Sequence, residues 1–81
     1  MNHYRVDADK MLDLLRLIHT GDYSTSEMAT ILSVSTRTIS RMMKVLEDVF
    51  HVIITWEWTV GRQRVIYHVD DYGLFDKALF S

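Results

Sequence analysis

A basic face on one predicted helix carries the side chains whose chemistry is most informative. Arg37, Ser40, Arg41 and Lys44 recur at spacings of three and four residues, and no acidic residue interrupts them before Asp48. Residues at these spacings share one face of a helix, so their cationic groups lie side by side. Such a face binds anions such as nucleic-acid phosphates, and arginine also recognises guanine edges through paired hydrogen bonds. Taken alone, the pattern fits a merely solvated helix face equally well.

The helix that presents this face has both a start signal and an apolar side. Ser35 precedes it, and its hydroxyl can accept the backbone N–H of Arg37 or Thr38. The opposite side carries an apolar stripe at helical spacing, formed by Ile39, Met42, Met43, Leu46, Val49 and Phe50. We therefore predict a helix over residues 36–49.

A shorter helix is predicted immediately before it, over residues 25–32. Ser24 and Glu27 have the spacing of a capping box, in which each side chain satisfies the other residue's backbone N–H. Met28, Ala29 and Leu32 then follow on one face. Because the caps of the two helices lie close together in the sequence, the helices are expected to meet at a steep angle.

The two helices carry a family resemblance. The run Met28-Ala29-x-x-Leu32-Ser33-Val34-Ser35-x-x-Thr38-Ile39-x-Arg41-x-x-x-x-Leu46 resembles the helix-turn-helix of winged-helix bacterial regulators, especially the biotin-operon-repressor and deoxyribose-operon-repressor types. The resemblance implies that Ala29 lies where the helices cross and that Ile39 fills the core. Ser33 stands where the family usually has glycine, and a left-handed backbone there costs about 1 kcal/mol.

The flanking segments match the same family in order, from about residue 7 to residue 70. A first helix is predicted over residues 7–20, with Asp7 or Asp9 as its cap and Gly21 at its end. Its buried face consists of Met11, Leu14, Leu15 and Ile18. From residue 52 to residue 70 the pattern changes to that of two strands around Gly61 and Arg62.

A two-residue turn at Gly61 and Arg62 predicts the register of this hairpin, or wing. One face then holds the apolar pairs Trp58–Val65, Trp56–Tyr67 and Ile54–Val69. The other, mostly polar, holds Thr59–Arg64, Glu57–Ile66, Thr55–His68 and Ile53–Asp70. We expect the apolar face to pack on the helices, with both tryptophans buried rather than serving as a stacking platform for nucleic acid.

The wing tip is expected to project with Arg62 and Arg64. The resemblance implies that such a tip contacts DNA phosphates or the minor groove. Charges on an edge strand also prevent association between sheets, and this second interpretation stays open.

A short amphipathic helix is predicted over residues 73–80. Two interpretations of it remain open. In the first, it packs on the helix at 7–20 and on the hairpin of the same chain. In the second, it forms a homodimer contact through Leu74, Phe75, Leu79 and Phe80.

Composition sets further bounds. The 81 residues are 48% hydrophobic and contain no cysteine, which predicts one domain, residues 1–81, without disulfides. No apolar run is long enough to span a bilayer and no signal-peptide pattern opens the chain, so we predict a soluble cytoplasmic protein. A net charge of −2 argues mildly against DNA, but the acids cluster near both ends of the chain, away from the basic helix.

These observations predict an α+β winged helix-turn-helix protein that binds double-stranded DNA in a sequence-specific way, as a dimeric transcriptional regulator. The candidate DNA-binding residues are Ser35, Thr36, Arg37, Thr38, Ser40, Arg41, Lys44, Arg62 and Arg64. The alternatives are a winged helix that binds other proteins and an excision-directing factor of a phage or mobile element. We expect no further domain, so regulation comes from concentration, a partner or self-association.

Catalysis is not expected. The histidines, His3, His19, His51 and His68, lack metal-ligand spacing, and no serine stands in a nucleophile motif. We therefore predict no enzyme activity, no cofactor, no metal and no small-molecule ligand.

Overall fold

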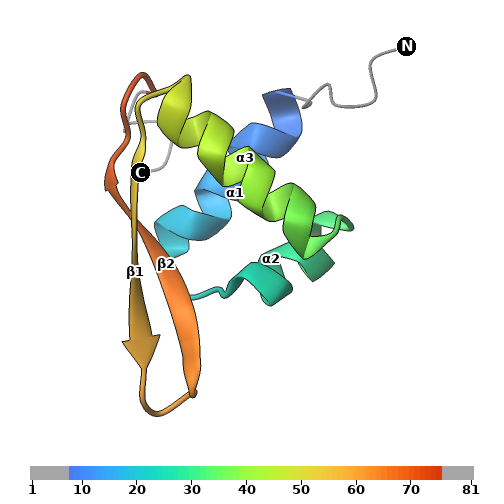
Figure 1. The fold of residues 1–81 in the computed structure, drawn as a ribbon, viewed down its shortest axis with the longest axis vertical. Helices are drawn as coiled ribbons and strands as arrows, with labels where there is room; N and C mark the ends of the chain where they lie inside the picture. The colour runs from blue at the N-terminus through green and yellow to red at the C-terminus, as the bar shows by residue number, and fades with distance from the viewer. Residues whose placement is uncertain (1–7, 76–81) are drawn as a thin grey trace.

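The computed structural model describes residues 8–75, which form three helices followed by a two-stranded antiparallel hairpin (Figure 1). The helices are α1 (Ala8–Thr20), α2 (Thr25–Leu32) and α3 (Thr36–Asp48), and the strands are β1 (Ile53–Thr59) and β2 (Arg64–Asp71). This α+β layout is that of a winged helix and confirms the predicted fold class. The helices lie together on one side of the hairpin, whose tip extends beyond them.

The predicted local signals at the helix ends are confirmed. Gly21 ends α1 with φ of 69°, and its N–H donates to the Ile18 carbonyl at 3.0 Å. At the start of α2 the capping box is complete, because Ser24 N–H donates to Glu27 Oε1 at 2.9 Å and Glu27 N–H donates to Ser24 Oγ at 3.4 Å. Of the two predicted cap residues of α1, Asp7 lies outside the described residues, and Asp9 lies within the first turn of the helix instead of before it.

The core lies between the three helices, as predicted. Each helix contributes its apolar stripe, and Val52 joins them just before β1. The buried members are Met11, Leu14, Leu15, Ile18, Met28, Ala29, Ile39, Met42, Leu46 and Val52. The inclusion of Val49 in the buried stripe is wrong, because α3 ends at Asp48 and the Val49 side chain is exposed. Within residues 8–75, no helix has the length and apolar character needed to cross a membrane.

The predicted hairpin register is confirmed for six of the seven residues of β1. Trp56 lies opposite Tyr67, Trp58 opposite Val65 and Thr59 opposite Arg64, in the predicted order. The exception is Ile53, which lies opposite Asp71 instead of Asp70, because the ladder is irregular between Ile53 and Ile54. An extra residue at such a bulge shifts the pairing by one position.

The predicted two-residue turn is wrong, because β1 ends at Thr59 and β2 begins at Arg64. The N–H groups of Arg62 and Gln63 donate to the Thr59 carbonyl at 3.3 and 2.7 Å. Positive φ occurs at Gln63 (53°) and not at Gly61. The loop thus spans residues 60–63, and its glycine is not in the conformation that a primed turn requires.

The predicted burial of the two tryptophans is also wrong. The part of their face that packs on the core consists of Ile54 on β1 and of Tyr67 and Val69 on β2, all half-buried. Trp56 and Trp58 have 66% and 55% of their surface exposed, although Trp56 lies directly opposite Tyr67. On the opposite face Ile66 is buried instead, with 3% exposed.

The polar face of β2 is covered by the connection between α1 and α2. Arg64 reaches Glu27, and a Cβ atom added to Gly21 would meet His68 Nδ1 at 2.7 Å. Ile66 lies between Arg64 and His68 on the same face of β2, so the same connection shields it from water. The helices and their connection therefore contact both faces of β2, whereas on β1 only Ile54 packs on the core.

The segment after β2 is described as far as Phe75. Gly73 has φ of 60°, and the N–H of Leu74 donates to the Phe50 carbonyl at 2.8 Å. Phe75 N–H donates to the Tyr72 carbonyl at 3.0 Å, so residues 72–75 form a turn. The rest of the predicted helix at 73–80, including Leu79 and Phe80, lies outside the described residues.

Candidate nucleic-acid interface

The turn between α2 and α3 determines where the basic helix begins. Ser33 has the left-handed backbone expected for this position, with φ of 57° and ψ of 44°. Its N–H points back to the carbonyls of Ala29 and Thr30, and the N–H of Val34 donates to the Ala29 carbonyl at 3.0 Å. These bonds satisfy carbonyls at the end of α2. The turn therefore ends at Val34, and α3 can start directly after it.

Two of the predicted site residues form the cap of α3. Ser35 Oγ accepts the N–H of Thr38 at 3.1 Å and lies 3.0 Å from the Thr38 hydroxyl. Thr38 is half-buried, whereas Thr36 beside it is exposed. Ser35 and Thr38 thus hold the start of α3 in place, and Thr36 is the hydroxyl available to a ligand.

The structure brings together four of the predicted side chains on one exposed surface of α3, which we call the α3 basic face: Arg37, Ser40, Arg41 and Lys44. The opposite side of the helix is fully packed, because Ile39 and Leu46 have no exposed surface. Lys44 Nζ lies 3.7 Å from Asp48 Oδ2, and both side chains are mostly exposed. Such a pair contributes only about 0.3 to 0.5 kcal/mol, so an incoming phosphate can replace the carboxylate.

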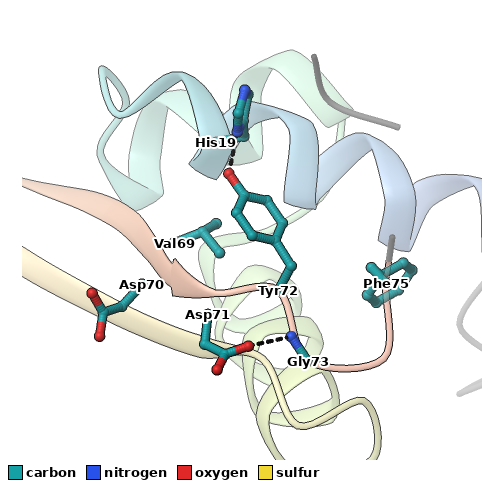
Figure 2. A pocket seen from close by; sticks show the side chains of 7 residues that line it. All are labelled: His19, Val69, Asp70, Asp71, Tyr72, Gly73 and Phe75. Atoms are coloured by element: carbon teal, nitrogen blue, oxygen red, sulfur yellow. Dashed lines mark hydrogen bonds between the residues drawn. The ribbon is translucent and has the colours of Figure 1, made fainter. Parts of the chain in front are cut away.

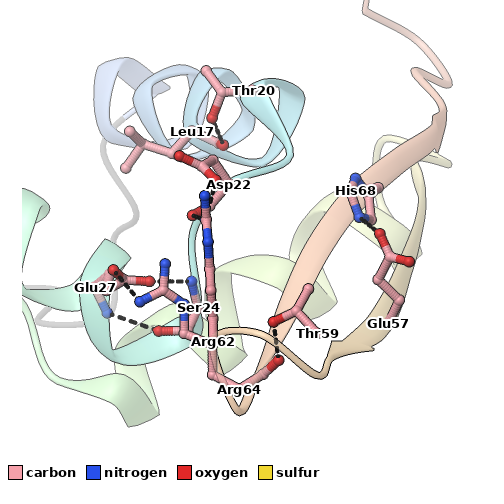
Figure 3. Close-up of polar contacts among 10 residues, drawn as sticks. All are labelled: Leu17, Thr20, Asp22, Ser24, Glu27, Glu57, Thr59, Arg62, Arg64 and His68. Carbon is pink, nitrogen blue, oxygen red and sulfur yellow. Dashed lines mark hydrogen bonds and ion pairs between the residues drawn. The ribbon is translucent and has the colours of Figure 1, made fainter.

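The two wing arginines do not project as expected. Arg62 Nη1 donates to the carboxylate of Asp22, in the connection between α1 and α2. Arg64 Nη1 lies 3.0 Å from Glu27 Oε2. Figure 3 shows both guanidinium groups turned toward these two acids. The ion pairs therefore join the wing to the α1–α2 connection and partly neutralise its charge.

This arrangement follows from the position of β2. Tyr67 N–H donates to the Tyr23 carbonyl at 3.4 Å, which holds β2 beside the α1–α2 connection. Side chains at the start of β2 then face the first turn of α2, where the sequence places Glu27. The acid that caps α2 is thus also the acid that holds Arg64.

Glu27 is stabilised in its charged form. The pKa of its carboxyl lies below the ordinary value, chiefly because the carboxylate accepts the backbone N–H of Ser24. The Ser24 hydroxyl and the charges of Arg64 and Arg62 lower the pKa further, and partial loss of solvent opposes them. At neutral pH Glu27 is therefore charged and can keep its ion pair with Arg64 of the wing.

Sequence reasoning missed the exposed tryptophans on β1. The signal that could have revealed them is Ile66, an apolar residue between Arg64 and His68 in the middle of the mostly polar face. A large apolar residue in the middle of a polar face indicates that this face, too, is covered. In a hairpin that extends beyond the helices, part of the apolar face must then remain in water.

A shallow hollow lies where the end of α1 meets the end of β2 (Figure 2). The residues that line it are His19, Val69, Asp70, Asp71, Tyr72, Gly73 and Phe75. The Tyr72 hydroxyl bonds to His19 Nδ1 across it, and Asp71 Oδ1 accepts the N–H of Gly73 at 2.8 Å. Two carboxylates make this hollow unfavourable for phosphate, in contrast to the α3 basic face.

The described residues do not meet the requirements of a metal site. Among residues 8–75, no group of three or more His, Cys, Asp or Glu side chains is arranged to hold a metal ion. Comparison with protein-family models, curated proteins and solved structures finds no match for this chain.

Proposed function

We propose that this protein binds double-stranded DNA through the α3 basic face and acts as a small regulator of transcription. The observation that supports the proposal is an exposed row of cationic and hydroxyl side chains on a helix whose other side is fully packed. A helix that enters the major groove needs donors on its outer side and rigid support on its inner side. α3 has both.

The side chains take different roles along the helix. Thr36, Arg37 and Ser40 lie in the first turns of α3, where recognition helices contact base edges. Arg41 and Lys44 lie further along and bind phosphates. The N-terminus of α3 adds its free backbone N–H groups and the positive end of the helix dipole.

The wing has a secondary role in this proposal. The ion pair between Arg62 and Asp22 is about half exposed on both sides, with 48% and 55% of the side chains in contact with water. Exposed pairs of this kind are weak, so a phosphate can take the place of Asp22. Arg64 is more enclosed and stays with Glu27.

Dimeric binding is part of the proposal, because a single short recognition helix reads too few base pairs for a specific site. Two copies related by a two-fold axis read half-sites about one DNA turn apart. Of the tail residues considered for the dimer, Leu74 is exposed, whereas the Phe75 ring packs on Phe50 of the same chain at a centroid distance of 4.9 Å. For Phe75, packing within its own chain is therefore favoured.

The test is a salt titration of binding to duplex DNA. Arg41→Gln is compared with Arg16→Gln, which removes the same charge from the exposed side of α1. We expect retention of the parent that falls steeply with salt, a slope that is shallower by about one contact for Arg41→Gln, and no change for Arg16→Gln. A parent that is indifferent to DNA, or two variants that respond alike, would contradict the proposal.

A second candidate function is a protein-interaction module, which the exposed Trp56 and Trp58 favour. Indifference to duplex DNA in the same titration supports this candidate. An excision-directing factor would use the same DNA contacts as a regulator of transcription. A recombination assay on a duplex selected for binding from a random pool separates those two roles.

A further inference from the structure

One edge of the hairpin is open. On the far side of β2, the N–H of Tyr67 bonds to the Tyr23 carbonyl, so the α1–α2 connection occupies the middle of that edge. On the far side of β1, no further strand pairs with it among residues 8–75. Figure 1 shows β1 on the side away from the helices in the half of the hairpin nearest the tip.

The pairing pattern identifies the backbone groups that face this edge. Because the N–H of Tyr67 points to Tyr23, it points away from β1, and Trp56 and Tyr67 form a non-hydrogen-bonded pair. In such a pair the N–H and C=O groups of both residues point outward. The backbone N–H and C=O groups of Trp56 therefore point to the open edge. The same holds two positions away on either side, at Ile54 and Trp58.

β1 lacks the features that usually protect an open edge. Natural edge strands carry lysine, proline or repeated bulges, which block pairing with another chain. β1 has neither lysine, arginine nor proline, and its one irregularity lies at its first residue. Its single charge, Glu57, is turned toward β2, where its Oε1 lies 2.6 Å from His68 Nε2. The strand is also rich in tryptophan, isoleucine and threonine, which favour β structure.

We propose that β1 pairs antiparallel with β1 of a second copy, with the two-fold axis at Trp56, to form a four-stranded sheet. In this register Trp56 lies opposite Trp56 of the second copy, and Trp58 lies opposite Ile54. The outward-facing backbone groups of these residues then hydrogen-bond across the axis. The exposed tryptophans become cross-strand aromatic and aliphatic pairs.

The charges select this register. With the axis at Trp56, each Glu57 lies opposite a Thr55 of the second copy, and the regular residues Ile54 to Trp58 all pair. An axis at Glu57 would place the two carboxylates opposite each other, which is unfavourable. An axis at Thr55 would require the irregular Ile53 to pair and would leave Trp58 outside the ladder.

The two-fold symmetry limits this contact to two copies. After pairing, the outer strands of the sheet are the two β2 strands, and on each of them Tyr67 is bonded to Tyr23. A two-fold contact of this kind is closed and does not continue into a fibre. Nucleic acid is not the favoured occupant, because the apolar face of the hairpin carries no cationic side chain beside the tryptophans.

The experiment measures the mass of the full chain by sedimentation over a range of concentrations, for the parent and for Trp56→Lys and Trp56→Glu. Because position 56 lies opposite itself, each variant alone places like charges on the axis and raises the dimer dissociation constant by about 100-fold. An equimolar mixture of the two variants places opposite charges there and recovers dimers. The control variant Val60→Lys, in the exposed loop outside β1, dimerises as strongly as the parent.

Tryptophan fluorescence gives an independent readout, because the 2 tryptophans of the chain both lie on β1. Dimerisation of the parent shifts the emission to shorter wavelength as the concentration rises, and circular dichroism verifies that each variant is folded. A parent that remains monomeric with water-exposed emission overturns the proposal. A dimer that survives Trp56→Lys, or a mixture that does not recover, also overturns it. Neither outcome depends on DNA, because no residue of the α3 basic face takes part.

Discussion

Arg64 of β2 places its Nη1 3.0 Å from Oε2 of Glu27, the same residue that caps α2. The other carboxylate oxygen of Glu27 accepts the backbone N–H of Ser24. A single acid thus connects the start of α2 to the hairpin, and three cationic or N–H groups stabilise its charge. Loss of that charge should weaken the junction between the helices and the wing.

The pH dependence of stability should report this junction. The pKa of Glu27 is lowered in the folded state, so protonation favours the unfolded chain. The stabilisation is fully present above the ordinary glutamate pKa and is lost as the pH falls through the lowered value. Urea unfolding should show the parent more stable than Glu27→Gln at neutral pH, with the difference shrinking in acid. A difference that stays constant over this range would count against the role of the charge.

Substitutions on the two faces of the hairpin should differ strongly in their effect on stability. Ile66→Ala removes a side chain that is 3% exposed and should lower the free energy of unfolding by about 2 to 5 kcal/mol. Trp56→Ala removes a side chain that is mostly in water and should lower it by less than about 1 kcal/mol. Denaturant unfolding at a concentration where the chain is monomeric measures both. The reverse order would restore the inward orientation of the tryptophans.

Two glycines offer a matched comparison. Gly21 has φ of 69°, and an added Cβ would lie 2.7 Å from His68 Nδ1, so Gly21→Ala should destabilise by about 1 to 3 kcal/mol. Gly61 has no neighbour within 4 Å of an added Cβ and no positive φ, so Gly61→Ala should be close to neutral. Thermal unfolding of both variants measures the contrast, and equal melting temperatures would exclude the contact between β2 and the end of α1.

The proposed DNA interface predicts a difference between recognition and general affinity. Arg37→Ala should cost about 1 to 3 kcal/mol per half-site and broaden sequence preference, because Arg37 lies in the first turn of α3. Arg62→Ala should weaken binding to all sequences alike and lower the salt slope by about one contact. Binding to a duplex selected from a random pool, and to its point variants, separates the two effects. If both variants bind like the parent, the result would contradict the proposed binding of DNA.

Asp22 should restrain the wing. Asp22→Asn removes the carboxylate that holds Arg62 and leaves the side chain similar in size. The freed guanidinium can then bind a phosphate, so DNA affinity should rise and the salt dependence should become steeper. Combining Asp22→Asn with Arg62→Ala should cancel the gain. An increase that persists in the double variant would trace the effect to the loss of negative charge alone.

Local signals determined much of the fold. The capping box at Ser24 and Glu27 and the cap at Ser35 were predicted from residues only a few positions apart. The left-handed backbone of Ser33 was expected from the resemblance to a turn that usually holds glycine. Helix bounds and core residues followed because the helical period places every third or fourth residue on one face. The hairpin register was predictable because alternation along two strands permits few pairings, although the loop between them was misjudged.

The sequence by itself thus determined the three helices, their core and the basic face of α3. Only the tertiary structure decided which parts of the hairpin are covered and where Arg62 and Arg64 point. Those features depend on the position of β2 beside the α1–α2 connection, where Tyr23, Asp22 and Glu27 meet residues some forty positions away. Periodicity reports which residues share a face, but burial depends on what packs against that face. Trp56 shows the difference, because it shares a face with Tyr67, which packs on the core, yet 66% of its own surface is in water.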